Sequence, residues 1–215
     1  MTAPTPLIHV VDDDESLRTA LLRLLDAAGF KARGYASVGD FLLQLPPDGP
    51  GCVLLDVRMP GPSGLDLQAA LLRQGNTLPV VFLTGYADVA ASVQAMKSGA
   101  VDFLTKPVDE NTLTEAVDKA IIKQSEMQRQ RTLTKSVQER LATLTRRERE
   151  VMQQVMTGAM NKQIAVQLGI SEKTVKVHRA HVMQKMHTSS AAELVALCAG
   201  AKLLRGTPVN HPDRQ

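Results

Sequence analysis

The sequence predicts an α/β domain built on a doubly wound, five-stranded parallel sheet, followed by a smaller all-α domain of four helices. Three observations support this prediction. The 215 residues are enough for two small domains. Short apolar runs alternate five times with segments of helical periodicity in about the first 120 residues, which is typical of a parallel sheet with right-handed crossovers. After this region the helical pattern continues without a strand-like run.

The most informative expected strand covers residues 53–55, ends in Asp56, and is followed by the Pro/Gly-rich turn 60–64. A run so short and so apolar indicates a strand buried on both faces of a sheet. The other expected strands are 7–11, 31–35, 79–84 and 101–105, and helices are expected over about 17–28, 38–45, 65–73 and 89–98, with a further helix from about Glu110.

Polar residues stand where these strands end. Asp12 and Asp13 follow the first strand, Asp56 ends the third, Thr84 ends the fourth and Lys106 follows the fifth. The carboxyl ends of parallel strands open on one edge of the sheet, so these side chains are expected to lie close together. Each of them alone is explained equally well as a helix cap or a turn residue. Five at one edge favour a functional site.

The expected cluster suits phosphoryl transfer. Three gathered carboxylates repel one another and need a cation, and an all-oxygen ligand set suits Mg²⁺. Lys106 can offer a positive charge to a phosphoryl oxygen, and the hydroxyl of Thr84 can donate a hydrogen bond. Asp56 would be the nucleophile that forms an aspartyl phosphate, because phosphoryl transfer mainly needs positioning and charge neutralisation.

Charge divides the chain. Residues 1–120 carry nine Lys and Arg against fifteen Asp and Glu, whereas residues 121–215 carry sixteen against seven. A basic second half favours nucleic acid as its partner, and its lack of aromatic residues argues against stacking on single strands, so duplex DNA is expected. No apolar run is long enough for a membrane span, no signal peptide begins the chain, and the two cysteines match no metal or disulfide pattern. We therefore expect a cytoplasmic protein without a membrane partner.

The second half contains the signature of a helix-turn-helix. Capping residues Thr145, Asn161, Ser171 and Ser190 predict four helices, with capping boxes at the first and last of them. The tight turn 168–171 joins the second and third. The third helix has an apolar face for the core and a cationic face for solvent, although a solvated basic stripe on an ordinary helical domain fits the same spacing. The polar segment 121–143 before them is expected to be a partly helical linker, with a flexible tether as the alternative.

The first half resembles the receiver domain of bacterial two-component response regulators, a flavodoxin-like fold. The matching residues are Asp12 and Asp13, the strand ending at Asp56 before Met-Pro-x-x-x-Gly, Thr84, and the Lys106–Pro107 pair. The resemblance implies that a histidine kinase phosphorylates Asp56. It implies Mg²⁺ bound by Asp12, Asp13, Asp56 and the Arg58 backbone carbonyl, and a switch pair of Thr84 and Phe103. Phe103 departs from the frequent Tyr, so a switch through a Tyr hydroxyl is not available.

The second half resembles the LuxR-type DNA-binding domain in the stretches 144–151, 161–168 and 170–178, and the whole chain resembles a NarL/FixJ-type response regulator, the FixJ-like branch more closely. This resemblance implies a set of residues that contact DNA in or beside the major groove: Asn161, Lys162, Lys173, Thr174, Lys176, Val177 and Arg179. The expected organisation is a receiver over 5–124, a linker over 125–143, a DNA-binding domain over 144–205 and a disordered tail over 206–215.

The expected function is phosphorylation-dependent regulation of transcription, with self-phosphorylation and dephosphorylation at Asp56 as the only chemistry. The expected partners are a sensor histidine kinase, promoter DNA, a second copy of the chain after phosphorylation, and RNA polymerase. One alternative is a regulator whose receiver is only a dimerisation scaffold and is never phosphorylated. Another is an aspartate-nucleophile phosphatase, but that class needs a general acid two residues after the nucleophile, where this chain has Arg58.

Overall fold

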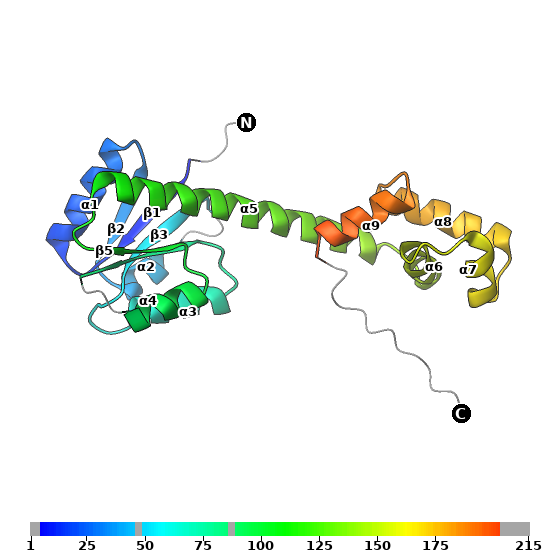
Figure 1. Ribbon diagram of the computed structural model, residues 1–215, viewed down its shortest axis with the longest axis horizontal. Coiled ribbons are helices and arrows are strands. Elements are labelled where there is room, and N and C mark those ends of the chain that lie inside the picture. Colours follow the sequence, from blue (N-terminus) through cyan, green and yellow to red (C-terminus); the bar gives the residue numbers. More distant parts are fainter. Residues whose placement is uncertain (1–4, 46–48, 86–88, 203–215) are drawn as a thin grey trace, which may run out of the picture. The chain divides into compact units, whose positions relative to one another are not determined.

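A computed structural model of the chain describes residues 5–45, 49–85 and 89–202 (Figure 1). The chain forms two compact units, Met1–Gln128 and Arg129–Gln215, which are described separately. The expected disordered tail, 206–215, lies outside the described residues.

The first unit is built on a five-stranded parallel sheet with the strand order β2-β1-β3-β4-β5, which confirms the predicted α/β fold. Each strand is followed by a helix, so all five strands point the same way. The elements are β1 (Leu7–Val11), α1 (Glu15–Ala27), β2 (Lys31–Tyr35), α2 (Val38–Gln44), β3 (Gly51–Asp56), α3 (Gly64–Arg73), β4 (Val80–Thr84), α4 (Val89–Lys97), β5 (Asp102–Thr105) and α5 (Glu110–Ala142).

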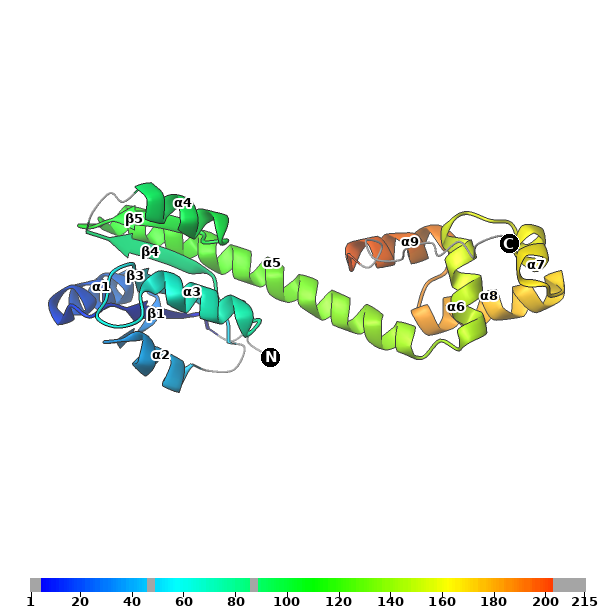
Figure 2. The same ribbon diagram turned by 90° about the horizontal axis from the view of Figure 1, so that it is seen from below.

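The central strand β3 is buried along its whole length, as its apolar sequence predicts. Because side chains alternate along a strand, Leu54 packs into one core with α1 and α5, and Leu55 packs into another with α2, α3 and α4. Figures 1 and 2 show these two layers of helices on opposite faces of the sheet. Burial on both faces holds the ends of β1, β3 and β4 in a fixed arrangement.

A close backbone contact sets the start of α3 beside the end of β3. Ser63 and Asp66 form a capping box at this helix terminus, with Ser63 Oγ accepting from the Asp66 amide. The backbone of Gly64 lies so near that a Cβ atom there would be 2.2 Å from the carbonyl oxygen of Asp56. Only glycine fits this approach without a shift of the backbone, which gives the last residue of the Met-Pro-x-x-x-Gly motif a physical reason.

Helix α5 is continuous from Glu110 to Ala142 and covers the segment that the sequence analysis expected to link two domains. Its residues after Arg129 are part of the second unit rather than a free tether. Val137 is completely buried in the core of that unit. Gln130 Nε2 donates to the carbonyl of Gly200 at 2.7 Å, and Arg140 Nη1 donates to the carbonyl of Met186 at 3.0 Å. These contacts satisfy carbonyl groups at the ends of two later helices, α8 and α9.

The second unit contains the four predicted helices: α6 (Arg146–Met156), α7 (Asn161–Leu168), α8 (Glu172–Met186) and α9 (Ala191–Gly200). The predicted capping box of Thr145 and Glu148 is present, and Ser171 and Ser190 cap α8 and α9 as expected. Two local expectations are wrong. Asn161 is the first residue of α7 and not its cap, because the Gln163 side chain accepts from the Met160 amide. The carboxylate of Glu193 accepts from the amide and the hydroxyl of Ser189, and no capping box with Ser190 is present.

We predict that Gly64→Ala destabilises the first unit by about 1–3 kcal/mol, the usual cost of forcing extra atoms into a packed site. The measurement is thermal unfolding of the full-length protein, followed by hydrogen exchange in β3 and α3. Gly39→Ala is the matched control, because a Cβ atom there would meet its nearest neighbour at an ordinary 3.7 Å within a helix. Equal stability of the two variants would contradict the close-approach argument.

Candidate acidic site and nucleic-acid interface

Three carboxylates meet at the carboxyl edge of the sheet. Asp12 and Asp13 follow β1 and Asp56 ends β3, and one carboxylate oxygen of each lies within 4.8 Å of the others. Asp12 is fully buried, Asp56 is 9% exposed and Asp13 is exposed. The strand order therefore brings together residues that are more than forty positions apart in the sequence. Asp14, by contrast, is the N-cap of α1 and accepts from the amides of Ser16 and Leu17.

Lys106 bridges two of the carboxylates from the far end of β5. Its Nζ atom lies 2.7 Å from Oδ2 of Asp12 and 3.0 Å from Oδ2 of Asp56. Burial is the largest effect on this ammonium and lowers its pKa, but the hydrogen bonds to Asp12 and Asp56 outweigh it, so the pKa of Lys106 is raised. The side chain consequently stays charged and contacts the cluster as a fixed cation.

Burial dominates at Asp12. Desolvation raises the pKa of its carboxyl above the usual range, although the hydrogen bond from Lys106 and the amide of Asp14 act in the opposite direction. Its backbone carbonyl accepts from Arg18 Nη1 at 2.7 Å, which holds the first turn of α1 against the strand end.

The donor set fits a divalent cation. Three carboxylates against one bridging ammonium leave a formal charge of −2 among the described groups in contact. The available ligand atoms are all oxygens, as Mg²⁺ prefers, and the exposed Asp13 leaves room for bound water. An acidic triad of this composition is typical of a magnesium site.

The remaining expected site residues surround the cluster. Thr84 is 2% exposed at the end of β4, and its carbonyl accepts from the Lys106 amide at 2.7 Å. The Arg58 amide donates to Oδ1 of Asp56 at 3.3 Å. Phe103 pairs in register with Phe82, is half-buried against the core of the α2–α4 face, and has its ring centroid 6.1 Å from that of Phe82. The two members of the expected switch pair thus lie on adjacent strands.

In the second unit, α7 and α8 form a helix-turn-helix. Gly169 ends α7 in the left-handed conformation, with φ of 64°, and Ser171 Oγ then accepts from the Thr174 amide to begin α8. Val175, Val182 and Met186 of α8 are buried in the core, as their spacing predicts. This packing determines which residues of α8 remain on its outer face.

The residues expected to contact DNA divide into two groups. Lys162, Lys173, Lys176 and Val177 are exposed, whereas Asn161, Thr174 and Arg179 are half-buried. The structure joins the two helices through a contact that the sequence analysis missed, since Arg179 Nη1 donates to Oδ1 of Asn161 at 3.2 Å. The contact fixes the guanidinium of Arg179 near the start of α7. Thr174 shares a hydrogen bond of 2.7 Å with the cap hydroxyl of Ser171.

Glu148 is a second feature that the sequence analysis located only in part. Its capping role was predicted, but its pairing with Lys185 of α8 was not. Lys185 Nζ lies 2.7 Å from Glu148 Oε2 and also donates to the carbonyl of Thr143 at 3.2 Å. These hydrogen bonds, from Lys185 first and from the Thr145 amide next, lower the pKa of Glu148 to about 2. The pair ties α6 to the end of α8.

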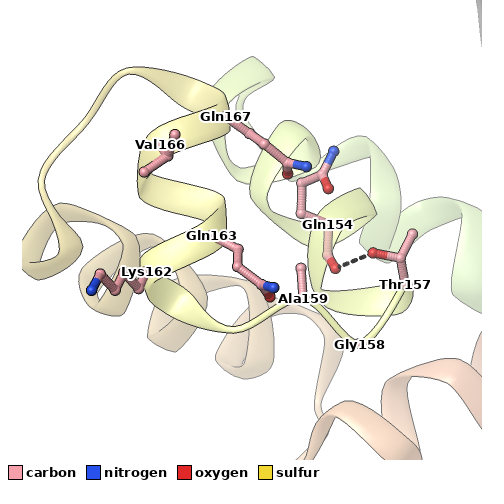
Figure 3. Close-up of a pocket in the computed structure, with 8 residues that line it drawn as sticks. All are labelled: Gln154, Thr157, Gly158, Ala159, Lys162, Gln163, Val166 and Gln167. Atoms are coloured by element: carbon pink, nitrogen blue, oxygen red, sulfur yellow. Dashed lines mark hydrogen bonds between the residues drawn. The ribbon is translucent and has the colours of Figure 1, made fainter.

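A groove of about 690 Å³ lies beside the outer face of α7, next to the end of α6 (Figure 3). Gln163 and Ala159 point into it, whereas Lys162 extends to the side of α7 away from α6. Its rim includes Val166, which is 80% exposed despite being apolar.

Comparison with known protein families gives one match to each unit. Residues 8–118 match the response regulator receiver domain, and residues 142–198 match the bacterial regulatory proteins of the luxR family. None of the described helices is long and apolar enough to cross a membrane.

Individual relatives match over nearly the whole chain. Nodulation protein W of Bradyrhizobium diazoefficiens is 40% identical over 97% of this chain and 90% of its own length. The transcriptional regulatory protein FixJ of Azorhizobium caulinodans is 43% identical over 90% of this chain and 92% of its own. Among solved structures, response regulator StyR matches with a TM-score of 0.78 and 42% identity, over 91% of this chain and 98% of its own.

We predict that Glu148→Gln destabilises the second unit by about 1–3 kcal/mol at pH 7, because Lys185 loses a charged, buried partner. The pKa of Glu148 is depressed in the folded protein, so its contribution is complete above about pH 4.5 and disappears as the pH falls towards about 2. Hydrogen exchange in α6 and α8, compared between variant and wild type at each pH, measures this difference.

The matched control is Glu150→Gln on the same helix, where the carboxylate is paired with arginines at a more exposed position. A difference between Glu148→Gln and wild type that persists unchanged at pH 2 would contradict the assignment to this carboxylate.

Proposed function

The chain belongs to the two-component response regulators that join a receiver domain to a LuxR-type DNA-binding domain, and on that basis we propose that phosphorylation of Asp56 controls its binding to promoter DNA. A member of this family is a transcription regulator and not a catalytic enzyme, and its partners are a histidine kinase and DNA. The observation that carries the proposal is the cluster of Asp12, Asp13 and Asp56 with Lys106 across it.

In the proposed reaction a carboxylate oxygen of Asp56 attacks the phosphorus of a kinase phosphohistidine. The nitrogen–phosphorus bond breaks, the imidazole leaves with the bonding pair, and an aspartyl phosphate forms. The ammonium group of Lys106 already contacts Asp56 and could shift to contact a phosphoryl oxygen. Thr84, at the end of the neighbouring strand β4, would donate its hydroxyl to another.

Asp13 and Asp56 would hold Mg²⁺ through their side chains, with Asp12 assisting and the Arg58 carbonyl as a further ligand. The bound ion would neutralise negative charge that builds up between the carboxylates and the incoming phosphoryl group. The net charge of the cluster supports this assignment, since the charge of Lys106 alone does not balance the three carboxylates.

The proposed output is a change in the shape of the surface formed by α4, β5 and α5. When Thr84 is drawn to the phosphoryl group, Phe103 on the adjacent strand would repack, because the two residues belong to paired strands and Phe103 is only half-buried. Two copies of the chain would then associate through this face. Two linked DNA-binding units on paired half-sites bind far more tightly than one, so dimerisation would convert phosphorylation into promoter occupancy.

We assign the receiver to residues 5–124 and the DNA-binding domain to 144–205, with 125–143 between them. The burial of Val137 and the contacts of Gln130 and Arg140 support a role for the end of α5 in the fold of the second unit. Lys162, Lys173, Lys176 and Val177 would face the DNA from α7 and α8. Asn161, Thr174 and Arg179 would act at their junction, where the contact between Asn161 and Arg179 pre-orients a guanidinium.

Two further assignments follow from this function. RNA polymerase is the proposed protein partner on DNA, and the groove beside the exposed Val166, lined mainly by polar side chains, is the proposed surface for such a contact. The proposed location is the cytoplasm, where phosphohistidine donors and promoter DNA are both found. The competing function is a receiver that serves only as a dimerisation scaffold, and the pairing of Lys106 with Asp56 argues against it, because a scaffold does not need that arrangement.

We predict that wild-type protein gains mass in light scattering when Mg²⁺ and beryllofluoride, a phosphoryl mimic, are added together, and that Asp56→Asn does not. The reason is that the mimic needs a carboxylate oxygen at position 56 to complete its coordination. Asp26→Asn, an exposed carboxylate on α1, is the matched control and should respond as the wild type does.

A dimer that forms equally in wild type and Asp56→Asn, with or without the mimic, would favour the scaffold and reject phosphorylation as the signal. Beryllofluoride bound to Asp56 without a change in mass would reject dimerisation as the output.

We predict that Lys176→Ala weakens binding to random-sequence duplex DNA by about tenfold at roughly 0.1 M salt and lowers the slope of log affinity against log salt by about one. The reason is the loss of one phosphate contact from the exposed face of α8. Fluorescence anisotropy of a labelled duplex over a series of salt concentrations measures both quantities.

Lys135→Ala is the matched control, because Lys135 is an exposed lysine on α5 with no proposed role in DNA binding. Equal effects of the two substitutions would show that general charge, and not the face of α8, determines the affinity.

A further inference from the structure

The first unit contains a cavity of about 210 Å³ at the edge of the sheet opposite the acidic cluster. It lies where α3 ends and β4 begins, beside the end of α4 and the middle of α5. Its walls are largely apolar and come from Leu71, Leu78, Val80 and Met127. Neither phosphorylation nor DNA binding, as proposed above, uses this cavity.

Five polar side chains line the same cavity, and three of them, Thr77, Lys123 and Asn76, have hydrogen-bond donors to spare. Thr77 is only 6% exposed, and no hydrogen bond of its hydroxyl is found among the described residues. Lys123 Nζ donates once, to the carbonyl of Gly99 at 3.1 Å, and an ammonium has three donors. Asn76 accepts from the Leu78 amide through Oδ1, which leaves the amide hydrogens of its side chain for another partner.

The Thr77 hydroxyl is accessible from the cavity, since among the described residues only Nδ1 of His178 is both fully buried and unpartnered, so it can donate to a bound molecule. The Gln68 side chain donates to the carbonyls of Ala95 and Ser98, and Lys123 donates to that of Gly99. No Asp or Glu lines the cavity. The site therefore offers donors and one positive charge, but no negative charge.

We propose that this cavity binds a small monocarboxylate with an apolar body, of the size of benzoate. The apolar body would lie among Leu71, Leu78, Val80 and Met127, and the carboxylate would accept from Lys123 and from the hydroxyl of Thr77. Acceptor oxygens are what the donor-rich polar groups lack, and an apolar body matches the walls. The volume is too small for a nucleotide or a peptide helix and suits a molecule of about ten heavy atoms.

The test is a titration of ¹⁵N-labelled full-length protein with sodium benzoate, followed by NMR. We expect saturable shifts of the amides of Thr77, Gly99 and Lys123, with a dissociation constant on the order of 1 mM for so small a ligand. Benzylamine, which has the same ring and the opposite charge, should cause no saturable shifts at these amides.

Two substitutions separate the proposed contacts from general effects. Lys123→Met and the isosteric Thr77→Val should each weaken benzoate binding by about tenfold. Lys119→Met, one turn earlier on α5 and outside the cavity lining, should change it by less than about twofold.

The proposal would be overturned by an absence of saturable shifts at these amides up to about 20 mM benzoate, or by equal binding by Lys123→Met and Lys119→Met. Tight binding of benzylamine would also overturn it, since the charge argument would then be wrong. Beryllofluoride binding at Asp56 is measured separately, so failure here leaves the proposed regulation by phosphorylation intact.

Discussion

The ammonium of Lys106 between Asp12 and Asp56 is the interaction on which the carboxyl edge of the first unit depends. The carboxylates at the ends of β1 and β3 meet at this point, and without a cation they would repel one another inside a partly buried site. A single lysine relieves the repulsion only in part. The edge is consequently held together and still short of positive charge, which is the condition that a bound metal ion can satisfy. The same shortage of positive charge explains why Lys106 is needed at this edge and why the proposed phosphoryl transfer needs a metal ion there.

In the second unit the groups that need partners are cations, whereas at the carboxyl edge of the first unit they are carboxylates. It is basic, and some of its cations form contacts inside the unit. Lys185, Arg140 and Arg147 do so by donating to Glu148 and to the carbonyls of Met186 and Leu168. These contacts join helices, although the side chains of Lys185 and Arg147 remain 34% and 39% exposed. The lysines of α7 and the outer face of α8 remain exposed, so the unit separates structural cations from those available to a polyanion.

The strands and helices could be predicted closely from the sequence because strand ends, caps and apolar periodicity are local signals. The cluster of Asp12, Asp56 and Lys106 could also be predicted, because a parallel sheet brings the ends of its strands together regardless of which side chains they carry. Contacts across helices could not be predicted. Glu148 and Lys185 are 37 positions apart in the sequence. Asn161 was predicted to cap a helix because its side chain is a common cap, whereas in the structure it accepts a hydrogen bond from Arg179. Nothing in the local sequence around Thr77 indicates a cavity, because its walls come from two helices, a strand and two loops that are far apart in the sequence.

The close approach of Gly64 to Asp56 has an electrostatic consequence as well as a steric one. It brings the first turn of α3 to the end of β3, and the N-terminus of a helix carries about half a positive charge from its aligned peptide dipoles. Helix α1 begins at the same edge, directly after Asp13 and its cap Asp14. Part of the positive potential at this edge therefore belongs to the main chain. No side-chain substitution can remove that part without moving a helix, so under the proposed function this contribution to holding a phosphoryl group belongs to the fold itself.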